Sequence, residues 1–145
     1  MSDPFEHAAY LRGIELFNEH DFFEAHEVWE DIWRMAYGLK HDFYQGMIQC
    51  AVALEHYHRS NPRGVRGLYD SYRKRFIPIP PVFMGLDVTV FLGKMHRVLG
   101  PVVEADPVPA RGQITLDHSL VPKIELLYDP FETGEADQYS RPAKF

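Results

Sequence analysis

Apolar residues recur every three or four positions through most of residues 5–99, a spacing typical of amphipathic helices. A proline in the first turn marks two helix starts, at Pro4 and Pro62, where its missing N–H costs little. We expect Gly38 to end the second helix and Gly100 to end the fifth. The predicted fold is all-α, with about five helices that pair as antiparallel hairpins in a compact bundle. Their predicted ranges are residues 5–18, 22–36, 40–59, 62–76 and 87–99.

The second predicted helix lies in residues 16–34, the stretch richest in aromatic and acidic side chains. Asp21 precedes it and Glu24 follows three positions later, which is the spacing of a capping box. On a helical wheel of about 100° per residue, one broad apolar arc appears and His26 lies at its edge. The arc consists of Phe22, Ala25, Val28, Trp29, Ile32, Trp33 and Met35. In the first helix, the residues expected to pack inward are Ala8, Ala9, Leu16 and Phe17.

The third predicted helix has an apolar arc and a separate polar stripe. The arc consists of Phe43, Gly46, Met47, Cys50, Ala53, Leu54 and Tyr57. Gly46 within it indicates that another helix approaches closely. The stripe consists of Asp42, Gln45, Gln49, Val52 and His56. Because Lys and Glu dominate most solvated helix faces, this composition indicates that the stripe faces a groove.

After the fifth helix the pattern gives way to a segment with six prolines. We expect residues 101–145 to form an extended arm on a helical domain of residues 1–100, and not a second domain. Within the arm, residues 114–116 and 123–128 fit either short strands or extended chain. The polar stretch 129–145 is expected to be mobile.

Charge narrows the function classes. The formal net charge of −6 argues against nucleic-acid binding, which usually needs a basic surface. Residues 19–31 hold six carboxylates and no Lys or Arg, whereas residues 59–75 hold six bases and one acid. These two segments fit complementary solvated faces or a subunit contact, and the aromatic content of 14% is compatible with a homodimer. An anion or RNA site on the basic helix is the alternative.

Cysteine usage and hydropathy indicate a cytoplasmic protein. The single cysteine, Cys50, excludes an internal disulfide framework and is expected to be a buried, unreactive thiol. No run of about eighteen apolar residues occurs, so we expect no membrane-spanning segment. Residues 1–4 lack the basic and apolar regions of a secretion signal.

Two predicted turns resemble each other. Residues 20–26 lead into the second helix, and residues 60–66 lead into the fourth, forty positions later. That period lies in the range of helical repeats, although two copies also fit a bundle of two hairpins.

Spaced motifs in the chain resemble the DUF309 family, small helical proteins of unknown function. The first group is Leu16-Phe17-Asn18, Phe23-Glu24-Ala25-His26-Glu27, Glu30 and Trp33-Arg34. The second group is Phe43, Gln45-Gly46-Met47-Ile48-Gln49, Ala51-Val52-Ala53-Leu54, His56, Asn61 and Gly64. The resemblance covers roughly residues 12–99, and the chain has His20-Asp21 where the family commonly has a glycine. The resemblance implies an all-α fold and no established activity.

A polar cluster between the second and third helices is the candidate site. Its members are His26, Glu27, Glu30, Arg34, Gln45, Gln49 and His56. One interpretation is a structural hydrogen-bond network, in which Glu30 pairs with Arg34 four positions later. A second interpretation is a ligand-binding groove.

A third interpretation is a metal or catalytic site. His26 and Glu30 are four positions apart, so both side chains can reach one ion, and His56 would complete a set suited to Zn²⁺, Fe²⁺ or Mn²⁺. Glu27 is then a candidate general base. The other histidines show no ligand spacing and are expected to be solvent-exposed: His20, His41, His58, His96 and His118.

The leading functional prediction is a non-catalytic binding or interaction module that uses the polar groove for a small-molecule or protein ligand. On this prediction we expect no cofactor, and no catalytic residue is assigned. The runner-up is a hydrolase-like enzyme that uses a divalent metal. Its candidate residues are His26, Glu27, Glu30 and His56.

Overall fold

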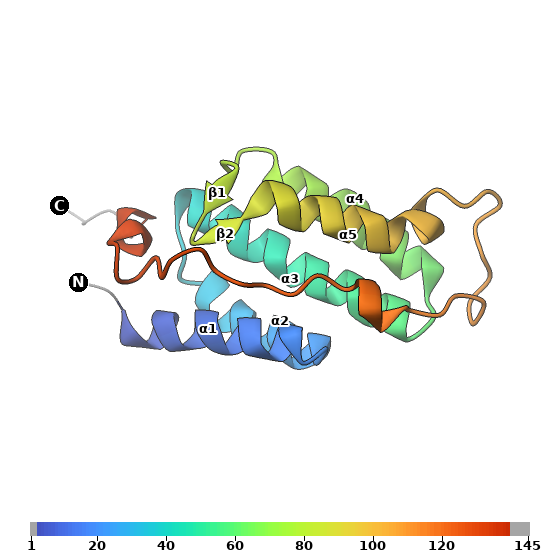
Figure 1. Ribbon diagram of the computed structural model, residues 1–145, viewed down its shortest axis with the longest axis horizontal. Coiled ribbons are helices and arrows are strands. Elements are labelled where there is room, and N and C mark those ends of the chain that lie inside the picture. The colour runs from blue at the N-terminus through green and yellow to red at the C-terminus, as the bar shows by residue number, and fades with distance from the viewer. Residues whose placement is uncertain (1–2, 140–145) are drawn as a thin grey trace.

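The chain folds into five α-helices with two short strands and two 3₁₀ helices, in a computed structural model that describes residues 3–139 (Figure 1). This confirms the predicted all-α class. The helices are α1 (Pro4–Asn18), α2 (Phe22–Trp33), α3 (Gly38–His58), α4 (Pro62–Phe76) and α5 (Val88–Val103). The remaining elements are β1 (Val82–Phe83), β2 (Leu86–Asp87), η1 (His118–Leu120) and η2 (Glu135–Tyr139).

The third helix, α3, packs between α2 and α4, while α1 packs on α2 and α5 on α4 (Figure 1). Glycines allow two of these close approaches. A Cβ atom on Gly13 would overlap the Trp29 ring, and a Cβ atom on Gly46 would lie 2.6 Å from the Phe76 ring. The close approach predicted at Gly46 is therefore confirmed, and its partner is the last residue of α4.

The predicted apolar arc of α3 forms the centre of the core. All seven of its members are buried: Phe43, Gly46, Met47, Cys50, Ala53, Leu54 and Tyr57. Aromatic side chains surround them, and the largest fully buried ones are Trp29, Tyr10, Tyr44, Tyr72, Phe17, Phe22 and Phe83. This core fixes how α2 and α3 lie against each other, and so fixes the candidate site.

The two turns predicted to be alike share one backbone geometry. His20 has φ 64° and Ser60 has φ 55°, both in the left-handed region. The N–H of His20 donates to the carbonyl of Phe17, and the N–H of Ser60 donates to that of Tyr57, each at 2.9 Å. His20 and Ser60 thus adopt the left-handed conformation that glycine adopts most readily.

Helix ends differ from the predicted ones in three places. The second helix ends at Trp33 instead of residue 36. Gly38 has the expected positive φ of 59° but begins α3 instead of ending α2. Helix α5 continues past Pro101, because the proline removes only one hydrogen bond while the 1% exposed Val102 stays in the core.

Three local expectations are wrong. Ala8 is exposed, because it shares a face of α1 with the exposed Arg12 and Glu15, four and seven positions later. Met35 lies beyond the end of α2 and is 56% exposed. Asp21 stands at the N-cap of α2, but within residues 3–139 its side chain makes no capping hydrogen bond.

Residues 104–139 return from the end of α5 along the helices toward the start of α1 (Figure 1). The Asn18 amide receives a hydrogen bond from the Ile124 N–H at 2.8 Å and donates one to the Ile124 carbonyl at 2.9 Å. The Ser60 hydroxyl makes the same pair of contacts with the backbone of Ile114, at 3.1 and 2.7 Å. Side chains at the α1–α2 and α3–α4 turns therefore hold this segment in place.

The expectation of a polar, mobile stretch at 129–145 does not describe residues 129–139, and residues 140–145 lie outside the described residues. Phe131 is 6% exposed and Ala136 is 2% exposed, so both anchor the stretch in the core. Of the two alternatives for residues 114–116 and 123–128, the structure shows chain without strands. In the described part of the chain, strands occur only in the antiparallel pair β1–β2.

Between residues 3 and 139, none of the helices combines the length and the apolar character needed to cross a membrane.

Candidate functional site

A groove separates the start of α2 from the end of α3, on the face where the sequence predicts one. It encloses about 270 Å³ and is lined by Phe23, His26, Val52, Glu55, His56 and Arg59, which together define the α2–α3 groove. Phe23 is 46% exposed, and its ring lies 5.0 Å from the His26 ring, edge to face. Glu55 and Arg59 pair at 2.7 Å on α3. The groove thus combines two apolar side chains with a polar margin.

His26 and Glu30 form a chain of contacts along α2. The Nε2 atom of His26 lies 3.4 Å from the Glu30 carboxylate, and Arg34 lies 3.5 Å from the other oxygen of that carboxylate. The Nδ1 atom of His26 contacts the Phe23 carbonyl at 2.5 Å. The predicted Glu30–Arg34 ion pair is therefore present. It occupies the carboxylate that a metal ion would need.

His56 lies in the last turn of α3 and contacts the residues that lead into α4. The Asn61 side chain accepts a hydrogen bond from the Gly64 N–H at 3.3 Å and thereby caps α4. Its amide nitrogen, 3.1 Å from Nδ1 of His56, donates to that atom. A Cβ atom on Gly64 would lie 2.5 Å from the same ring, so only glycine fits against it. Three residues of the predicted family motif thus form one packed unit.

The hydrogen bond from Asn61 fixes the tautomer of the neutral His56 ring. Because Nδ1 accepts, the neutral ring carries its proton on Nε2. Burial lowers the pKa of His56 from its ordinary value of 6.5, with an opposing contribution from Glu55 and a further lowering from Arg59 and Arg111. Within residues 3–139 the Nε2 atom makes no hydrogen bond, and His56 lines the groove, so this N–H is an unused donor on a groove residue.

The other predicted site residues lie outside the groove. Glu27 is exposed and borders a shallow depression on α2 together with Glu24 and Asp31. Gln45 and Gln49 are half-buried and do not line the groove. The Oε1 atom of Gln49 is buried without a hydrogen-bond partner in the described part of the chain.

The metal-ligand set predicted from His26, Glu30 and His56 gains no support from the geometry. Among residues 3–139 there is no group of three or more His, Cys, Asp or Glu side chains arranged to hold a metal ion. His56 also presents an N–H at Nε2 instead of a lone pair. The runner-up enzyme function stays a prediction.

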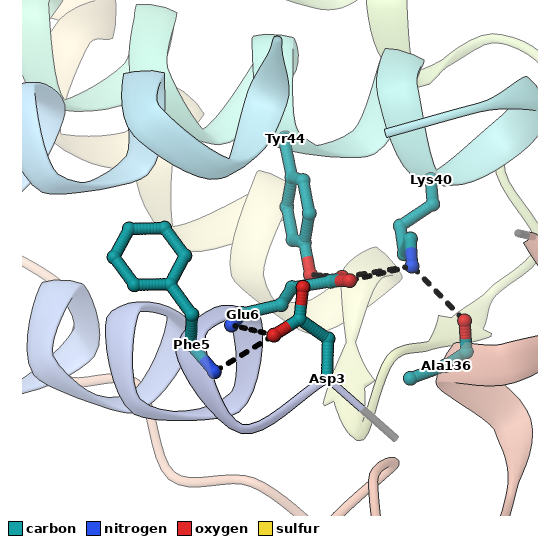
Figure 2. Close-up of polar contacts among 6 residues, drawn as sticks. All are labelled: Asp3, Phe5, Glu6, Lys40, Tyr44 and Ala136. Atoms are coloured by element: carbon teal, nitrogen blue, oxygen red, sulfur yellow. Dashed lines mark hydrogen bonds and ion pairs between the residues drawn. The ribbon is translucent and has the colours of Figure 1, made fainter. Parts of the chain in front are cut away.

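Sequence reasoning missed a buried polar network that ties together the two ends of the described chain. Lys40 is 4% exposed and lies 2.8 Å from the Glu6 carboxylate. Its ammonium group also donates to the Ala136 carbonyl at 3.0 Å, and the Tyr44 hydroxyl donates to Glu6 at 2.6 Å. Figure 2 shows that the Lys40 and Tyr44 side chains of α3 both point toward the Glu6 carboxylate of α1. The signal in the sequence is helical spacing, since Phe43, Tyr44 and Met47 follow Lys40 by three, four and seven positions and are buried on the same face of α3.

The histidines expected to be exposed are only partly so. His58, His96 and His118 are exposed, but His20 and His41 are half-buried. The Nδ1 atoms of His20 and His118 lie 2.9 Å apart. The pKa of His20 is lowered from 6.5, mainly by burial and to a smaller extent by the charge of His118. This contact joins the α1–α2 turn to η1, across a separation in sequence that spacing cannot reveal.

Cys50 is fully buried, and burial raises the pKa of its thiol well above the ordinary value. The expectation of an unreactive core cysteine agrees with this.

A family model for DUF309, a domain of unknown function, matches residues 10–68. This confirms the predicted resemblance, over a shorter range than residues 12–99. The matched range contains α2, α3 and the whole α2–α3 groove, while α5 and residues 104–139 lie outside it. A search among curated proteins found no match.

Proposed function

We propose that this DUF309-like chain is a non-catalytic interaction module whose α2–α3 groove receives an apolar side chain from a positively charged protein segment. The observation that carries the proposal is the groove itself. Phe23 is 46% exposed at its margin, and Val52 contributes a second apolar wall. A large aromatic side chain left in water next to a concave apolar surface is typical of a protein-binding site.

The size of the groove favours a protein ligand over a small molecule. Pockets for cofactors and drug-sized ligands enclose about 300 to 1,000 Å³. The α2–α3 groove encloses about 270 Å³, which suits the anchoring side chain of a polypeptide. His56 adds a hydrogen-bond donor at Nε2 that could fix the orientation of that segment.

The charge around the groove favours a cationic ligand. Glu24, Glu27 and Asp31 are exposed on α2, and together they form the acidic face of α2. In the described part of the chain, none of these three carboxylates takes part in an ion pair. Phe23 and His26 border both the groove and the acidic face, so the two surfaces are continuous. Electrostatic complementarity of this kind steers association and selects partners.

We also infer how the fold supports this surface. Helices α1 to α4 pair as two antiparallel hairpins, and residues 104–139 act as an extended arm that braces their turns. The contacts of Asn18 with Ile124 and of Ser60 with Ile114 support this view. The boundary between helical domain and arm then falls at the end of α5, three residues later than the predicted 100/101 division.

A designed peptide tests the proposed function. The probe is an amphipathic helical peptide with leucines on one face and lysines elsewhere, labelled for fluorescence anisotropy. We expect it to bind, and we expect Val52→Glu to weaken binding by at least about tenfold, which corresponds to about 1.4 kcal/mol. A peptide with glutamates in place of the lysines should not bind.

The matched control is Val90→Glu, which places the same charge on a 49% exposed valine of α5, outside the groove. This variant should bind the lysine peptide like the wild type. Equal binding of the lysine and glutamate peptides, or equal loss in both variants, would contradict a cation-selective groove.

A further inference from the structure

We propose that the segment received by the α2–α3 groove is the end of α4 of a second copy of this chain. This inference rests on the proposed function, because it names the occupant of the same groove. The α4 end is defined as Arg73, Lys74, Arg75 and Ile77.

The α4 end combines an exposed anchor with positive charge. Ile77, the C-cap residue of α4, is 80% exposed, the highest value among the exposed large hydrophobic side chains. The last turn before it carries Arg73, Lys74 and Arg75, all exposed. Cations at a helix C-terminus have an ordinary explanation in the helix dipole. That explanation does not account for an isoleucine left in water beside them.

The α2–α3 groove and the acidic face of α2 complement the apolar anchor and the positive charge of the α4 end. An aliphatic side chain fits the apolar wall of Phe23 and Val52, and the acidic face of α2 meets the three cations. Across residues 3–139, Arg73, Lys74 and Arg75 form no ion pair, and Arg73 only lies over the Tyr69 ring at 4.9 Å. Both charged surfaces therefore remain available for a partner.

The two surfaces cannot meet within one molecule. Helix α3 packs between α2 and α4, and Figure 1 shows α2 on the lower side and the connection from α4 to β1 on the upper side. Each copy consequently presents one groove and one α4 end on different faces. Such a contact between two different surfaces joins copies head to tail into an open chain or a closed ring, unless two copies exchange it reciprocally in a symmetric dimer.

The experiment is sedimentation velocity on the full chain at concentrations from about 1 µM to about 1 mM. We expect the wild type to form species that grow with concentration, and we expect added salt to weaken them because the charges are exposed. Ile77→Glu removes the anchor, and Val52→Glu blocks the groove. Each variant alone should remain monomeric.

Mixing the two variants gives the decisive result. Ile77→Glu retains an intact groove and Val52→Glu retains an intact α4 end, so the mixture should form a one-to-one dimer and nothing larger. Val90→Glu should associate like the wild type. Phe23→Ser, at an exposed position, replaces Val52→Glu if that variant is unfolded by circular dichroism.

A wild type that stays monomeric throughout this range overturns the inference. A mixture that does not pair, or single variants that still associate, overturn it as well. Binding of the lysine peptide by a monomeric wild type overturns only the second-copy partner and leaves the groove function standing. A wild type that neither binds the lysine peptide nor self-associates overturns both proposals.

Discussion

His56 is the residue at which the groove and the α3–α4 turn meet, and its titration reports on both. We expect an NMR titration of the His56 ring to give a pKa below 6.5, because burial disfavours the charged ring. Protonation at Nδ1 would also displace the hydrogen bond that Asn61 donates. Asn61→Asp should raise this pKa, since a carboxylate in place of the amide favours a proton on Nδ1. Asn61→Ala serves as the control and should change the pKa less, because the burial remains.

The same pKa shift sets the direction of a stability change with pH. With a lowered pKa in the folded state, the unfolded chain binds more protons over the interval below about 6.5. The contribution of His56 to the free energy of unfolding is therefore present above 6.5 and is lost as the pH falls through the folded pKa. Thermal unfolding monitored between pH 7 and pH 5 should show this loss, and Asn61→Asp should reduce it. An unchanged slope in that variant would contradict the assignment.

At the residue scale, sequence reasoning predicted the contact of His26 within its own helix but not the contact of His56 with Asn61. The His26–Glu30–Arg34 chain lies on one helix, so its spacing predicted it. The bond between His56 and Asn61 spans a turn whose left-handed residue, Ser60, is not a glycine. The turn itself was predicted, but the left-handed conformation of Ser60, which sets the position of Asn61, has no clear signal in the sequence.

At the scale of elements, Asn18 connects α1 to residues 104–139. Asn18→Ala should lower the free energy of unfolding by about 1–3 kcal/mol, because it leaves the N–H and the carbonyl of the 3% exposed Ile124 without partners. Urea unfolding measures this change. Hydrogen exchange should also become faster around Ile124. Lys123→Ala, at an exposed neighbour, is the control and should have little effect. An equal effect of both changes would show that Asn18 does not hold the segment.

The elements themselves followed closely from the hydrophobic spacing, because that spacing and the capping residues are local. Asn61 and Pro62 marked the start of α4 correctly. The ends depended on packing far away in sequence. Gly100 was predicted to end α5, yet Val102 is buried in the core and the helix continues past Pro101. The polar composition of residues 129–139 also led to the prediction of a mobile stretch. Its two buried apolar side chains, Phe131 and Ala136, are too few to form a pattern in the sequence.

At the scale of the whole molecule, Lys40 of α3 joins two other elements. It forms a buried ion pair with Glu6 of α1 and a hydrogen bond to the Ala136 carbonyl of η2. Lys40→Met should cost about 3–5 kcal/mol in urea unfolding, because it leaves the Glu6 carboxylate and the Ala136 carbonyl without their donor. The double variant with Glu6→Gln should be more stable than Lys40→Met alone, since a neutral amide still accepts from Tyr44. On α1, the helix that carries Glu6, breaking the exposed Arg12–Glu15 pair should cost less than about 1 kcal/mol. If Lys40→Met cost no more than that exposed pair, the network would not hold the ends of the described chain together.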